Sequence, residues 1–165
     1  MSLRILLLLA CGTAAVKAQP VLEVREASLP FDGGVVLHLS VVPFDSTEHR
    51  LEPCEPEGGP CLIDGVPMFG TDYTVPETVL ASAALEVGGR RVPLDVSGMT
   101  NPWWERPDEG QFTVEPFGPY HPERWTVRAA LSDGAGSYVA VWVVARGGAV
   151  RTVLMDAYSY EPCRE

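Results

Sequence analysis

The chain has 165 residues, of which 46% are hydrophobic and 21% are charged, with 22 Asp and Glu against 12 Lys and Arg. This length and apolar fraction fit one globular domain with a buried core, and they exclude a chain that is disordered throughout. The net charge of −10 argues against binding to nucleic acid or to an anionic membrane surface, because both depend on Lys and Arg.

Residues 1–19 have the pattern of a secretory signal peptide. One positive charge precedes an apolar run, which ends in small residues with Val16 and Ala18 at the −3 and −1 positions of a cleavage site. The run is too short for a transmembrane segment, which needs about 20 apolar residues. We therefore expect a single mature domain, residues 20–165, that is secreted or periplasmic. A second interpretation is a lipoprotein signal that ends at Cys11.

Strands are predicted along the whole mature chain. Apolar and polar residues alternate repeatedly with a period of two, and no stretch of about twelve residues keeps a helical period free of Gly or Pro. The predicted strands cover residues 21–27, 35–42, 79–87, 91–96, 111–115, 124–131, 138–145 and 149–156. Paired glycines at 88–89 and 147–148 supply the positive φ that short hairpins need. The pattern predicts an all-β domain, an antiparallel sandwich or flattened barrel with a three-stranded C-terminal meander.

Residues 43–72 contain five prolines and are predicted to be a loop. Within them Cys54 and Cys61 bracket the sequence CEPEGGPC, whose ends can meet in a compartment where disulfides persist. Such a disulfide would stabilise the chain by roughly 2.5 kcal/mol. Cys163 is then free, intermolecular, or the true partner of one of the other two. The spacing is not that of a metal site, so no metal is expected here.

A second loop, over residues 97–122, carries adjacent tryptophans in NPWWERPDEG and a tyrosine in PFGPYHP. Trp103 and Trp104 point to opposite sides if the segment is extended, so at most one of them enters the core. The other covers a neighbouring loop or meets a ligand. Two interpretations follow: an aromatic lid over one end of the sandwich, or, together with Tyr120, a platform on which a carbohydrate stacks.

The segment between two strong strands at residues 132–138 reads SDGAGSY and is longer than a minimal hairpin turn. It supplies the candidate partner-binding residues Ser132, Asp133, Gly136, Ser137 and Tyr138. Its second half, AGSY, resembles the strand-flanked Ser-Gly-x-Tyr signature of the periplasmic lysozyme inhibitors, with Ala135 in place of the first serine. The resemblance implies a β-sandwich or β-barrel domain whose loop enters the lysozyme cleft. The alternative is a glycine-rich hairpin with no binding role.

Catalytic motifs are missing from the sequence, which contains no HExxH, GxSxG, GxGxxG or Walker pattern and no calcium loop. The three histidines, His38, His49 and His121, are far apart. A Ser-His-acid triad would have to be assembled from distant residues, since geometry rather than order defines it. A hydrolase with such a dispersed site is the least favoured hypothesis, and no cofactor is expected.

Removal of the predicted leader leaves 22 acidic residues against ten arginines, a net charge of −12. Complementary potentials would steer such a domain toward a basic secreted or envelope protein. The leading hypothesis is therefore a non-catalytic binding protein, an inhibitor or immunity-type partner of a cationic cell-wall hydrolase such as lysozyme. The alternative is a carbohydrate- or envelope-binding module that uses Trp103 and Trp104.

Overall fold

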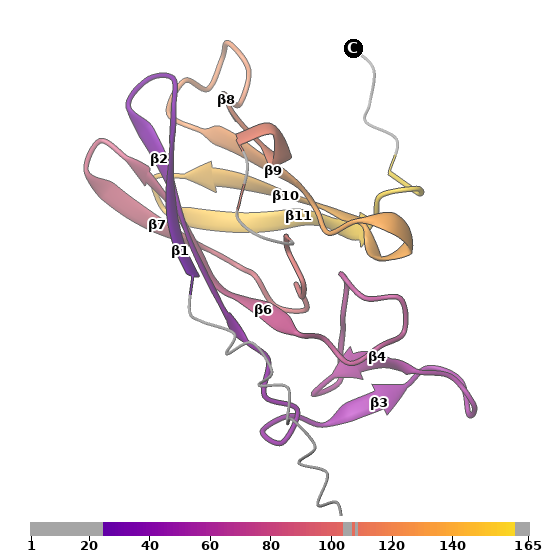
Figure 1. The fold of residues 1–165 in the computed structure, drawn as a ribbon. Helices are drawn as coiled ribbons and strands as arrows, with labels where there is room; N and C mark the ends of the chain where they lie inside the picture. The colour runs from indigo at the N-terminus through magenta and orange to yellow at the C-terminus, as the bar shows by residue number, and fades with distance from the viewer. Residues whose placement is uncertain (1–24, 104–106, 108, 161–165) are drawn as a thin grey trace, which may run out of the picture.

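The computed structural model describes residues 25–103, 107 and 109–160, and it is an all-β sandwich (Figure 1). The first strand continues to Phe31, past its predicted end at residue 27. The eight predicted strands correspond to β1 (Arg25–Phe31), β2 (Val35–Pro43), β6 (Thr78–Val87), β7 (Arg90–Leu94), β8 (Phe112–Pro116), β9 (Trp125–Leu131), β10 (Tyr138–Ala145) and β11 (Gly148–Asp156).

Two four-stranded antiparallel sheets form the layers of the sandwich. The first has the order β1-β2-β6-β7 and the second the order β11-β10-β9-β8. The C-terminal meander thus has four strands rather than three, because β8 pairs with β9 from Phe112 opposite Ala129 to Pro116 opposite Trp125. On one side the edge strands β7 and β11 lie next to each other (Figure 1).

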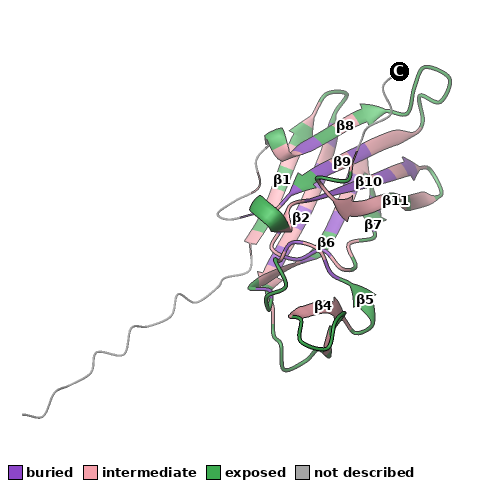
Figure 2. Cartoon of the chain, turned by 90° about the vertical axis from the view of Figure 1, so that its right-hand side faces the viewer, coloured by how far each residue is buried: buried purple, intermediate pink, exposed green. Residues whose placement is uncertain are grey.

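The core lies between the two sheets, where alternation directs every second side chain inward. In β2 the pattern is regular, with Val35, Leu37, Leu39 and Val41 buried and the residues between them half-buried. Figure 2 shows buried residues along the strands of both layers. Each inward Val or Leu stabilises the fold by roughly 1.5–3 kcal/mol relative to an exposed side chain.

The prediction that residues 43–72 form only a loop is wrong, because this connection contains a third antiparallel sheet. Its strands are β3 (Leu51–Pro53), β4 (Pro60–Ile63) and β5 (Val66–Pro67). Strands of two to four residues are too short to show an alternation, and each of them begins or ends with proline, which cannot donate to a ladder. This small sheet extends from one end of the sandwich (Figure 1).

The predicted disulfide between Cys54 and Cys61 is confirmed, with Cα atoms 5.7 Å apart, and it closes the connection between β3 and β4. The predicted signal peptide lies outside the described residues, and so do Cys11 and Cys163. Within the part of the chain that the structure describes, no helix has the length and apolarity needed to cross a membrane.

Arg151 on β11 joins the two sheets through polar contacts. Its guanidinium donates to the Ser97 carbonyl at 2.7 Å and lies 3.1 Å from the Asp95 carboxylate, just after β7. The Trp142 indole donates to the Asp95 carbonyl at 2.8 Å. Burial raises the pKa of the Asp95 carboxyl, but the hydrogen bonds from Ser97 and the charge of Arg151 outweigh it and hold this pKa below its ordinary value.

We expect Arg151→Ala to lower the free energy of unfolding by about 2 kcal/mol in urea titrations at neutral pH, because it removes the charge-assisted hydrogen bonds of a side chain that is only 16% exposed. Arg50→Ala is the control, since Arg50 is 74% exposed and its ion pair with Glu52 contributes less than about 1 kcal/mol. The pKa of Asp95 is lower in the folded protein than its ordinary value of 3.8. Its ion pair with Arg151 therefore stabilises the fold fully at pH values above 3.8. This stabilisation is lost as the pH falls through the lower folded pKa, so the difference between wild type and Arg151→Ala should shrink there. Equal effects of the two variants at neutral pH would contradict this role of Arg151.

Candidate functional site

The β9–β10 loop (residues 132–137) is fastened to two segments that are distant in sequence. It leaves β9 at Ser132, with a φ of 61°, and makes one 3-10 turn, η2 (Gly134–Gly136). The Ser132 amide donates to the Pro102 carbonyl at 2.9 Å, and the Ser132 hydroxyl donates to the Gly70 carbonyl at 3.2 Å. The loop is therefore tied to residues 101–103, which we call the tryptophan segment, and to the segment that follows the small sheet.

The chain after β11 fastens the loop from another side. The Ala157 amide donates to the Ser137 carbonyl at 2.9 Å, and the Tyr158 hydroxyl donates to the Gly134 carbonyl at 3.2 Å. Only the tip, residues 133–135, is exposed. The loop thus presents a three-residue tip on a base held by hydrogen bonds.

Gly70 allows the close approach of three segments beneath this loop. It has a φ of 105°, and a Cβ at this position would overlap the Thr100 carbonyl oxygen. A Cβ on Gly136 would lie 3.1 Å from the Gly70 carbonyl carbon. The neighbouring backbone is paired as well, because the Phe69 amide donates to the Gly98 carbonyl at 2.8 Å. Nothing local in the sequence marks Gly70, because its need for glycine arises from tertiary contacts.

Tyr138 does not contact solvent, so its prediction as a partner-binding residue is corrected. Its side chain is completely buried between the sheets, and its hydroxyl donates to the Thr100 carbonyl at 3.2 Å. Its ring centroid lies 6.2 Å from that of Phe69. Burial raises the pKa of the Tyr138 phenol, which stays protonated. The alternation of β10 directs this side chain into the core, where it anchors the end of the loop.

The loop and the tryptophan segment line one pocket of about 580 Å³, which we call the loop pocket. Pockets of this size hold small molecules or long side chains. Its polar and aromatic lining includes Arg25, Glu77, Asn101, Trp103, Ser132 and Asp133. The structure therefore brings together Trp103 and the serine-containing loop, which the sequence presented as two alternative sites.

Trp103 forms a wall of the loop pocket rather than an open platform. It is only 8% exposed, and its indole Nε1 is buried without a hydrogen bond to the described residues. Tyr120 is 89% exposed in the β8–β9 connection and does not line this pocket. Trp104 lies outside the described residues. The predicted platform of Trp103 with Tyr120 is thus not assembled in the loop pocket.

A second pocket, of about 340 Å³, lies on the other side of the loop. It is lined by Gly136 and Ser137 together with Tyr73 and the Cys54–Cys61 disulfide. The small sheet therefore forms part of the surface around the loop. The sequence predicted the disulfide, but not that it lies beside the candidate binding residues.

Carboxylates dominate the charged lining of both pockets. Glu77 and Asp133 line the loop pocket, Asp72 and Asp156 line the second one, and among the described residues Arg25 is the one basic residue in either lining. A hydrogen bond from Ser159 holds the pKa of Asp156 below its ordinary value, so this carboxylate is charged at neutral pH. The loop therefore lies in a region of negative potential.

A serine, a histidine and a glutamate meet elsewhere, on the outer face of the first sheet. Ser28 Oγ lies 2.9 Å from His38 Nδ1, and His38 Nε2 lies 3.0 Å from a Glu86 carboxylate oxygen. Hydrogen bonds from Arg91 and then from His38 hold the pKa of Glu86 below its ordinary value. None of the three side chains lines either pocket beside the loop. A triad needs a cavity that holds the scissile bond, so this network does not favour the hydrolase hypothesis.

Among the residues that the structure describes, no group of three or more His, Cys, Asp or Glu side chains is arranged to hold a metal ion. Comparison of the chain with protein-family models, curated proteins and solved structures found no match.

Proposed function

We propose that the chain is a non-catalytic binding protein that holds a cationic partner protein at the β9–β10 loop. The observation that carries this proposal is that Ser132 and Asp133 of the loop share a pocket with Glu77. Two carboxylates in the lining of one pocket favour a Lys or Arg side chain of a partner, because charge-assisted hydrogen bonds are the stronger ones. A basic cell-wall hydrolase such as a lysozyme is a partner of this kind.

The conformation of the loop supports this role. A loop that is already held in its binding conformation loses little entropy when a partner binds. Hydrogen bonds at Ser132 and Ser137 hold the two ends, while Asp133 and Ala135 are exposed at the tip. Since Ala135 has no hydroxyl, we assign recognition to the Asp133 carboxylate and the loop pocket rather than to a side chain at position 135.

The net charge of the whole chain supports the same class of partner. The full chain has a net charge of −10, and removal of the predicted leader makes it −12. Such a charge raises the association rate with a basic protein, while the contacts at the loop determine how long the complex lasts.

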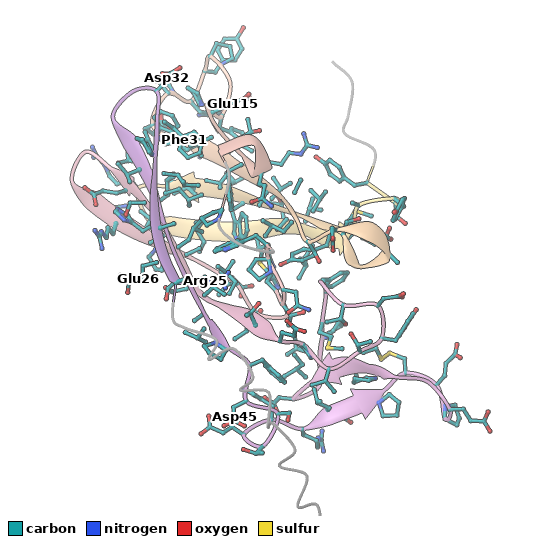
Figure 3. All side chains as sticks on the ribbon, viewed as in Figure 1. Arg25, Glu26, Phe31, Asp32, Asp45 and Glu115 are labelled. Carbon is teal, nitrogen blue, oxygen red and sulfur yellow. A yellow bond between two sulfur atoms is a disulfide. The ribbon has the colours of Figure 1, made fainter. Side chains whose placement is uncertain are left out.

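The test is a pair of substitutions in the loop pocket, Glu77→Gln with Asp133→Asn. We expect the pair to weaken binding to a strongly basic lysozyme by about tenfold or more, because each lost charged contact contributes roughly 1–3 kcal/mol. The matched control is Asp32→Asn with Glu115→Gln, which removes the same charge at the end of the sandwich away from Arg25 (Figure 3). Binding and inhibition are measured by calorimetry and by a cell-wall lysis assay.

Two results would contradict the proposal. Absence of binding between the wild type and basic lysozymes at about 100 μM would exclude this partner class, since that limit corresponds to roughly 5.5 kcal/mol. Equal losses in the pocket pair and the control pair would mean that total charge, rather than the loop pocket, determines affinity.

A neutral saccharide is the second candidate ligand for the loop pocket. It is favoured by the presence of Trp103, Asn101 and Gln111 in one lining, since aromatic and amide groups bind sugar rings and hydroxyls. Glycan-array binding that persists in the Glu77→Gln, Asp133→Asn pair, without affinity for lysozyme, would favour this function over the first.

A further inference from the structure

A third pocket, of about 400 Å³, lies between the β6–β7 and β10–β11 hairpins. In Figure 1 these hairpins are at the left, whereas the β9–β10 loop is at the right. The pocket has an apolar floor made by Val92 and Val144, which are 5% and 2% exposed, and by Trp125 and Val87. We call it the hairpin pocket, and it is separate from the loop pocket in position and lining.

Arg90 and Arg146 are exposed residues of the hairpin pocket's lining, one from each hairpin, and they form its rim. Arg90 donates hydrogen bonds to the carbonyls of Ala145 and Arg146, which are neutral acceptors. The Arg146 side chain makes no hydrogen bond or ion pair with the described residues. The third charged residue of the lining is Glu123, which lies 3.8 Å from Arg124 and is therefore already paired.

The other arginines that the structure describes differ from these two. Arg128 lies over the ring of Tyr160, 5.1 Å from its centroid, and Arg25 also has an interaction partner. Ion pairs with carboxylates are formed by Arg50, Arg91, Arg124 and Arg151. In an acidic domain, then, two guanidinium groups without a carboxylate partner occur at the same pocket. A pocket with unpaired cations at its rim and aliphatic side chains in its floor complements a ligand with an anionic head and an apolar tail.

We propose that the hairpin pocket binds an aliphatic monocarboxylate. The carboxylate accepts hydrogen bonds from Arg90 and Arg146 at the rim, and the hydrocarbon chain covers Val92 and Val144. An inorganic anion would leave the apolar floor exposed to water, and a neutral alcohol would leave the two guanidinium groups without a counter-charge. This binding is independent of the cationic partner at the opposite end.

The test is isothermal calorimetry with three ligands that separate charge from chain. Sodium octanoate has both, acetate has the charge alone, and 1-octanol has the chain alone. We expect saturable binding of octanoate below about 3 mM, where 1-octanol is still soluble, and none of acetate or 1-octanol in that range. Octanoate should also shift the fluorescence of the wild type by covering Trp125, and Trp125→Phe should remove that shift.

The arginine assignment is tested with Arg146→Ala and Arg146→Glu, because this side chain makes no hydrogen bond or ion pair with the described residues whose loss would disturb the fold. We expect octanoate binding to weaken about tenfold in Arg146→Ala and to disappear in Arg146→Glu. Arg91→Ala is the matched control, since Arg91 pairs with Glu86 outside this pocket. Lack of saturable octanoate binding by the wild type would overturn the proposal. Equal affinities of Arg146→Ala and Arg91→Ala would overturn it as well.

Discussion

Gly70→Ala is expected to lower the free energy of unfolding by about 3 kcal/mol or more, because the substitution combines backbone strain with a steric clash between the new Cβ and neighbouring backbone atoms. The φ of 105° at Gly70 is one that residues with a Cβ rarely adopt, and the added Cβ would overlap the Thr100 carbonyl oxygen. The backbone must move, and the Ser132 hydroxyl then loses the Gly70 carbonyl as its acceptor. Binding at the loop pocket should weaken along with stability.

Urea unfolding of Gly70→Ala and Gly134→Ala measures this effect. Gly134 also has a positive φ, 51°, but a Cβ there would meet open space. Gly134→Ala should therefore lower the free energy of unfolding by only about 1 kcal/mol, because alanine adopts a positive φ less readily than glycine does. Similar losses in the two variants would show that the close contact at Gly70 does not fix the segments beneath the loop.

Trp142→Ala is expected to destabilise the domain by about 4 kcal/mol, in the range for removal of a large aromatic side chain from a core. Trp142 is 1% exposed at the interface of the two sheets. Its indole also donates to the Asp95 carbonyl, which would lose this donor. The substitution therefore removes both apolar contact and a polar link between the layers.

Thermal and urea unfolding of Trp142→Ala, Trp142→Phe and Val150→Ala separate these contributions. Trp142→Phe keeps most of the apolar volume but not the hydrogen bond. Its free energy of unfolding should therefore lie between those of the wild type and Trp142→Ala. Val150 is 66% exposed on β11, and its truncation should change stability by less than about 0.5 kcal/mol. A loss below about 1 kcal/mol in Trp142→Ala would contradict its position in the core.

The long strands were predictable because each of them has one buried face. In β2 the alternation from Val35 to Val41 follows directly from burial of every second side chain. The small sheet was not predictable, since β5 has only two residues and carries no periodicity. The Cys54–Cys61 disulfide was predictable because it is local, since the two residues are only seven positions apart in the sequence.

The candidate site was predictable only in part. The sequence SDGAGSY marked the loop, because a glycine-rich insertion between two strands stands out locally. The resemblance to the Ser-Gly-x-Tyr signature places Tyr138 among the binding residues, although the inward alternation of β10 predicts its burial. Glu77 and Gly70 were missed because they join Ser132 only through contacts between segments more than fifty residues apart. Their contribution to the site depends on tertiary structure that local patterns do not encode.

Hydrogen exchange measured by mass spectrometry, with and without a strongly basic lysozyme, tests the proposed binding surface most directly. We expect the lysozyme to slow exchange of backbone amides in residues 70–78 and 132–138, which line the loop pocket or anchor the loop. Exchange in residues 117–124, outside the pockets beside the loop, should not change. Unchanged exchange at the loop with the lysozyme in excess, or protection confined to residues 117–124, would contradict the assignment of partner binding to the β9–β10 loop.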